Sequence, residues 1–163
     1  MSPRGKRSVI QELWDPSADF IERTKDVVEQ IKSISFENRS DTSLRVFAQW
    51  IRNSIKESGN PKEHLIPAFA LAREAARRVI GQTAYDCQIY AGIAMFEGKL
   101  TEMYTGEGKT LSAVMPATLM ALSGVRVHIL TFNDYLVQRD FEQMSPIFEL
   151  LGLSVGCVLA STP

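Results

Sequence analysis

The sequence has few of the residues that build disulfides or zinc sites. Its 163 residues include two cysteines and two histidines, and Cys87 and Cys157 lie 70 residues apart without any C-x-x-C pair. Disulfide frameworks and zinc sites need several such residues at short, regular spacings. This scarcity argues against both kinds of site.

A hydrophobic run long enough to cross a membrane is also absent. The longest uncharged run, residues 110–125, has 16 residues and contains a proline, whereas a span needs about 20 predominantly apolar residues. Near the N-terminus, Glu12 and Asp15 interrupt what would be the apolar part of a signal peptide. We therefore expect a cytoplasmic location.

The chain has no marked excess of basic residues. Residues 1–79 hold 14 Lys and Arg against 11 Asp and Glu, a charge of +3, and residues 80–163 hold 4 against 8, a charge of −4. A nucleic-acid interface usually carries a basic patch, because it must neutralise phosphates. The second half offers no such patch, and we expect no nucleic-acid partner.

What the chain does have is helical periodicity in residues 1–80. Apolar residues recur at spacings of three and four over 9–14, over 20–31, from Ser40 or Asp41 until Gly59, and over 67–78. Gly59-Asn60-Pro61 and Gly81 are typical stop signals. We interpret residues 1–80 as an N-terminal helical segment whose side chains mainly pack.

The pattern changes after residue 80. Helices are expected over 85–96, from the turn at 105–110 to 122, and over 134–150, and strands over 100–104, 125–130 and 153–159. Helices alternating with strands are typical of an α/β fold with a parallel sheet. We expect residues 81–163 to form the first part of a P-loop (RecA-like) parallel-sheet domain, still incomplete at residue 163.

The strongest chemical signal is the run Gly106-Glu107-Gly108-Lys109-Thr110. Glycines let successive backbone N–H groups point at phosphate oxygens, and the following helix N-terminus adds partial positive charge. Lys109 would bind the β- and γ-phosphates, and the Thr110 hydroxyl would bind Mg²⁺. The full phosphate-loop pattern has a glycine where this chain has Met103.

Gln88 lies 21 residues before Lys109. A glutamine amide donates and accepts at once, so it can pair with the N6/N7 edge of adenine. Tyr85 is close enough in sequence to pack beside the base. Gln88 thus resembles the adenine-reading glutamine of helicase-like ATPases.

Taken together, these pieces resemble the SecA family, the motor ATPases of bacterial preprotein export. The likeness covers about residues 40–156 and includes the phrases M-x-T-G-E-G-K-T and N-D-Y-L-x-x-R-D. It is carried by residues 65–70, 73–75, 86–88, 102–111, 131–136, 139–140 and 148–156.

The resemblance implies a nucleotide site for ATP or ADP with Mg²⁺. Its members would be Gln82, Tyr85, Gln88, Thr105, Gly106, Glu107, Gly108, Lys109, Thr110, Leu111 and Arg139, with Lys109 and Thr110 in catalytic roles and Thr110 on the metal. The chain departs from the usual family pattern at Gln82-Thr83, Tyr90-Ala91 and Tyr104. These departures leave open whether it is a divergent or accessory member.

The resemblance also implies a function: ATP hydrolysis that drives unfolded preproteins through the SecYEG channel, at the inner face of the cell membrane. A P-loop motor needs an acidic pair that ends a strand, and no hydrophobic run here ends in Asp-Glu. A second motor domain is also missing, so we expect little turnover from these residues alone. Two alternatives remain open, namely a helicase of the same superfamily and a non-catalytic nucleotide-binding fragment.

The first 14 residues and the oligomeric state allow further expectations. Arg4, Lys6 and Arg7 precede the apolar residues Val9, Ile10, Leu13 and Trp14, and such a segment could contact anionic lipid. A short basic tip without a partner is the alternative. A homodimer is compatible with the sequence, which does not choose an oligomeric state.

Overall fold

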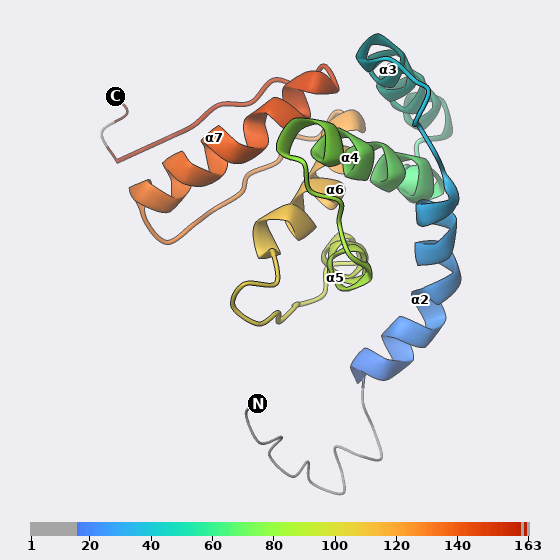
Figure 1. The fold of residues 1–163 in the computed structure, drawn as a ribbon, viewed down its shortest axis with the longest axis horizontal. Coiled ribbons are helices and arrows are strands. Elements are labelled where there is room, and N and C mark those ends of the chain that lie inside the picture. The colour runs from blue at the N-terminus through green and yellow to red at the C-terminus, as the bar shows by residue number, and fades with distance from the viewer. Residues whose placement is uncertain (1–15, 161, 163) are drawn as a thin grey trace, which may run out of the picture.

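A computed structural model describes residues 16–160 and 162 (Figure 1). In those residues the elements are α2 (Pro16–Ser33), α3 (Asp41–Ser58), the 3-10 helix η1 (Pro61–His64), α4 (Leu65–Ile80), α5 (Asp86–Phe96), α6 (Lys109–Leu122) and α7 (Asp134–Leu150). The expected helices after residue 16 are confirmed. The helix expected over 9–14 and the basic start lie outside the described residues. No described helix is both long and apolar enough to span a membrane.

Side-chain caps explain where two of the helices begin. The Ser40 hydroxyl accepts a hydrogen bond from Ser43 N at 3.2 Å, and Asn133 Oδ1 accepts one from Leu136 N at 2.9 Å. Each cap satisfies a backbone N–H that has no partner inside its own helix. Gly59 ends α3 at a φ of 69°, a left-handed conformation that glycine adopts without steric cost.

Helix α4 is the centre of the core, and Figure 1 shows it between α3 and α7. Its buried side chains are Leu65, Ala68, Phe69, Ala70, Leu71, Ala72, Ala75 and Ala76. Because most of these are small, α2, α3, α6 and α7 can all pack against the same helix. The alanine-rich helix α4 thus joins the first half of the chain to the second.

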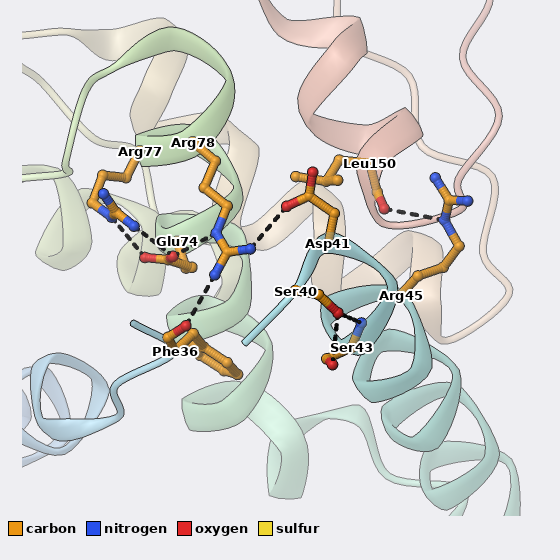
Figure 2. Close-up of polar contacts among 9 residues, drawn as sticks. All are labelled: Phe36, Ser40, Asp41, Ser43, Arg45, Glu74, Arg77, Arg78 and Leu150. Atoms are coloured by element: carbon orange, nitrogen blue, oxygen red, sulfur yellow. Dashed lines mark hydrogen bonds and ion pairs between the residues drawn. The ribbon is translucent and has the colours of Figure 1, made fainter. Parts of the chain in front are cut away.

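A polar junction connects α3 to both α4 and α7 (Figure 2). Arg78 of α4 donates to Asp41 at 2.8 Å, to Glu74 at 2.7 Å and to the Phe36 carbonyl at 2.9 Å. One turn further along α3, Arg45 donates to the Leu150 carbonyl at the end of α7, at 3.3 Å. Carbonyls in the last turn of a helix lack internal partners, so Arg45 caps α7.

The expected α/β fold is wrong for the residues that the structure describes. Residues 100–104, 125–130 and 153–159 are extended, but none of them forms a strand, and no sheet is present among the described residues. Figure 1 shows the segments before and after α7 running along different sides of that helix. The described fold is helical throughout.

The physical reason is that a strand needs a neighbour with which to exchange backbone hydrogen bonds. Residues 126–132 and 154–158 make no backbone–backbone hydrogen bond within the described part of the chain. Their apolar side chains are largely exposed, Leu130 at 90% and Val158 at 77%. The strand prediction from composition was wrong, because composition alone does not supply a pairing partner.

Candidate functional site

The candidate site lies where α5 and α6 pack closely. A Cβ added at Gly92 of α5 would lie 3.1 Å from the Ser112 carbonyl oxygen of α6 and 3.1 Å from Phe69 Cε1. Only a glycine permits this approach of the two helices, because both contacts are tighter than ordinary van der Waals distance. The close packing brings the first turn of α5 next to the glycine loop that precedes α6.

The loop itself contains two glycines in the left-handed region. Gly106 has a φ of 90° and Gly108 has a φ of 76°. Gly108 directly precedes α6, a helix of 14 residues whose first backbone N–H groups face out from its N-terminus. This arrangement offers hydrogen-bond donors and partial positive charge at one point, which is what a phosphate group requires.

Gln88 joins α5 to this loop. Its side chain is buried, and its Nε2 donates to the Glu107 carbonyl at 2.8 Å while its Oε1 accepts from Tyr85 N at 2.9 Å. A Cβ at Gly108 would lie 2.2 Å from Gln88 Nε2, so the amide rests directly on the loop backbone. Sequence reasoning placed Gln88 near the loop, but its contacts with loop backbone were not foreseen.

Lys109 and Glu107 both bind Tyr104. Lys109 Nζ donates to the Tyr104 carbonyl at 3.0 Å, and Glu107 Oε2 accepts from Tyr104 N at 2.9 Å. The Glu107 backbone N–H also donates to the Tyr104 carbonyl, at 3.2 Å. The loop lysine is therefore bound to the chain just before the loop.

The buried Ser112 hydroxyl contacts the loop backbone, and the sequence analysis did not predict this contact. Ser112 is fully buried in the first turn of α6, and its Oγ lies 3.3 Å from the Gly108 carbonyl and 3.4 Å from Met103 Sδ. Met103 occupies the position where the full phosphate-loop pattern has glycine. The only sequence signal for this contact is a serine among apolar residues on α6.

The remaining expected site residues differ in where they lie. Thr105 is exposed in the turn, Thr110 is half-buried in the first turn of α6, and Leu111 is buried in the core. Tyr85 is 75% exposed, and Gln82 is exposed in the connection between α4 and α5.

Arg139 binds its neighbour Asp140 at 2.6 Å, and neither of its hydrogen bonds reaches the loop. The structure thus brings Gln88 to the loop but not Arg139.

Two open hollows lie elsewhere on the described surface. One, of about 520 Å³, is lined by residues that include Arg23, Glu97 and Met120. The other, of about 510 Å³, lies between the ends of α3 and α6 and is lined by residues that include Arg52 and Lys56. Neither is lined by a loop residue, and Thr105, Gly106 and Glu107 of the loop are exposed on the surface.

The donor set at the loop fits a nucleotide phosphate better than it fits a metal alone. Backbone N–H groups, the Lys109 ammonium and the Thr110 hydroxyl are suited to phosphate oxygens and to a phosphate-bound Mg²⁺. Among the described residues, no three His, Cys, Asp or Glu side chains gather closely enough to hold a metal ion.

Comparison with known proteins gives one consistent result. Residues 10–163 match the family model of the SecA DEAD-like domain. The chain is 45% identical over 152 residues to the protein translocase subunit SecA of Carboxydothermus hydrogenoformans, which covers 92% of this chain and 17% of that protein. Against the SecA subunit of Francisella philomiragia the identity is 45% over 157 residues, or 94% of this chain and 17% of that protein.

A third relative matches a shorter part of the chain. The SecA subunit of Alcanivorax borkumensis is 47% identical over 124 residues, which cover 76% of this chain and 14% of that protein. The chain thus spans about a sixth of the length of the curated relatives that it matches. The family match includes the glycine loop, Gln88 and most of the described helices. The chain therefore belongs to the SecA family, through its SecA DEAD-like domain.

Proposed function

We propose that this chain is the nucleotide-binding part of a SecA-type preprotein translocase. The observation that carries the proposal is the glycine loop at the N-terminus of α6, which Gln88 contacts from α5. In this role the loop N–H groups and Lys109 bind the phosphates of ATP or ADP, and Thr110 binds the accompanying Mg²⁺. Hydrolysis of the bound Mg²⁺·ATP, which transfers its γ-phosphoryl group to water, would drive the translocase.

In this proposal, Gln88 and Tyr85 bind the adenine base. The Gln88 amide already uses one N–H and one lone pair on the protein, and it retains one of each for the edge of a base. Tyr85 is exposed at the start of α5, where its ring is available to pack on the base. The two hydrogen bonds of Arg139 both go to Asp140, so we assign it no contact with the base.

Turnover is expected to require more than these residues. Phosphoryl transfer needs acidic side chains that hold Mg²⁺ and orient the attacking water, and no hydrophobic run in this sequence ends in Asp-Glu. Preproteins and the SecYEG channel are the partners we propose for the full motor. Phosphate release measured on this chain should stay at the level of the Lys109→Ala variant, and turnover that depends on Lys109 would contradict this point.

Binding is tested by calorimetric titration of ADP with Mg²⁺ into the chain and into Lys109→Ala. Loss of a charge-assisted hydrogen bond costs about 1.5–3 kcal/mol, so the variant should bind about 10- to 100-fold more weakly. Lys99→Ala is the matched control, because Lys99 is an exposed lysine outside the loop. Equal affinity of all three proteins would overturn the proposed site.

A further inference from the structure

The contacts of Tyr104 suggest how nucleotide affinity is set at the loop. The Tyr104 carbonyl accepts from Lys109 Nζ at 3.0 Å and from the Glu107 backbone N–H at 3.2 Å. An ammonium and a loop N–H are the two kinds of donor that a phosphate oxygen would use. The Tyr104 carbonyl therefore competes with phosphate for the same donors.

The Glu107 side chain holds the Tyr104 backbone, and with it the competing carbonyl, in place. Its carboxylate accepts from Tyr104 N at 2.9 Å, so side chains of the loop bind both backbone groups of Tyr104. The carboxylate also places a negative charge within the loop that is to receive phosphates. Gln88 limits the freedom of the same segment, because it donates to the Glu107 carbonyl.

We infer that Glu107 is a latch that lowers nucleotide affinity by holding the Tyr104 carbonyl on Lys109. This inference rests on the proposed nucleotide binding and concerns its regulation. Binding requires Lys109 to leave the Tyr104 carbonyl, so the observed dissociation constant is the intrinsic one divided by the fraction of molecules that are unlatched. Any contact that draws the Glu107 side chain away from Tyr104 N would increase the affinity for nucleotide.

Two substitutions separate the latch from simple charge repulsion. Glu107→Gln removes the charge but keeps an oxygen that can accept from Tyr104 N, whereas Glu107→Ala removes both. The latch predicts that Glu107→Ala binds ADP with Mg²⁺ about three- to tenfold more tightly than the unsubstituted chain, with Glu107→Gln in between. Glu102→Ala is the matched control, because it removes an exposed negative charge two residues before Tyr104.

A second measurement tests the contact without nucleotide. Hydrogen exchange of the Tyr104 amide, followed by NMR, should be faster in Glu107→Ala than in the unsubstituted chain and in Glu102→Ala, because the amide loses its acceptor. Equal exchange rates in all three proteins would overturn the latch. So would equal ADP affinities of Glu107→Ala and Glu107→Gln, because charge repulsion would then account for the whole effect.

The outcomes also distinguish this inference from the function on which it rests. Binding that depends on Lys109 but is unchanged in both Glu107 variants would leave the nucleotide site standing and overturn the latch. Absence of ADP binding in every variant would overturn the proposed function, and the latch with it. Tighter binding in Glu107→Ala than in Glu107→Gln, with faster Tyr104 exchange, would support both.

Discussion

At the scale of single residues, the two loop glycines have similar conformations but different surroundings. Gly106 and Gly108 both have positive φ, which costs a residue with a side chain about 1–2 kcal/mol. Nothing lies within 4 Å of a Cβ built at Gly106, whereas a Cβ at Gly108 would lie 2.2 Å from Gln88 Nε2. The Gln88 amide is held at both ends, so it cannot simply move aside.

This difference predicts unequal effects of the same substitution. Gly108→Ala should lower the free energy of unfolding, and weaken ADP binding, by at least about 1 kcal/mol more than Gly106→Ala, because overpacking adds to the backbone cost. Thermal unfolding with and without ADP measures both effects. Adding Gln88→Ala to Gly108→Ala should recover part of the lost unfolding free energy. Equal losses for the two glycines would show that Gln88 does not rest on Gly108.

At the scale of elements, the sequence predicted the helices well because their signals are local. The start of α3 at Ser40 or Asp41 and its stop at Gly59 are predicted from a few neighbouring residues, and the structure has the Ser40 cap and the Gly59 stop. The glycine loop was found for the same reason. The expected strands failed because pairing depends on distant residues, and Arg139 could not be placed because its surroundings depend on how α7 packs.

The polar junction in Figure 2 carries a pH dependence that sequence could not show. The Arg77 side chain, by hydrogen bonding, and then Arg78 hold the pKa of the Glu74 carboxyl below its usual value of 4.5. A carboxyl whose folded pKa is lowered contributes stability above its unfolded pKa and loses that contribution as the pH falls through the folded value. Glu74 should therefore stabilise the fold at neutral pH and progressively less below about pH 4.5.

The Glu74→Gln variant tests the predicted direction in which stability changes with pH. At pH 7 the variant should lose about 2 kcal/mol of unfolding free energy, because the charge is removed and one of the two oxygens that accept from Arg77 and Arg78 becomes an NH2 group. The difference from the unsubstituted chain should shrink as the pH falls below about 4.5. Glu57→Gln, an exposed carboxylate near the end of α3, serves as the control. A Glu74→Gln effect that is constant from pH 7 to pH 3 in urea unfolding would contradict the account.

At the scale of the whole molecule, the exposed extended segments are the most unusual feature. Ile129, Leu130 and Phe132 are 53%, 90% and 94% exposed, in a segment that lacks backbone–backbone hydrogen bonds among the described residues. Unpaired backbone beside exposed apolar side chains favours pairing with another chain. We therefore expect this chain, on its own, to self-associate as its concentration rises.

Sedimentation velocity of two lysine variants tests this expectation. Leu130→Lys should reduce self-association, because a charge on an unpaired extended segment opposes pairing. Val46→Lys is the matched control, since Val46 is 65% exposed but lies on α3, whose backbone bonds are made within the helix. A chain that stays monomeric at all concentrations, or equal effects of the two variants, would contradict this interpretation.

The central claim is that the glycine loop is where this chain binds nucleotide, and NMR tests its location most directly. In a ¹⁵N-labelled chain titrated with ADP and Mg²⁺, the amides of Gly106, Gly108 and Lys109 should shift together with saturation. The amides of Gly59 and Gly152, at the ends of α3 and α7, should stay in place. Shifts confined to the hollow beside Arg52 and Lys56, or no shifts at all, would contradict the account.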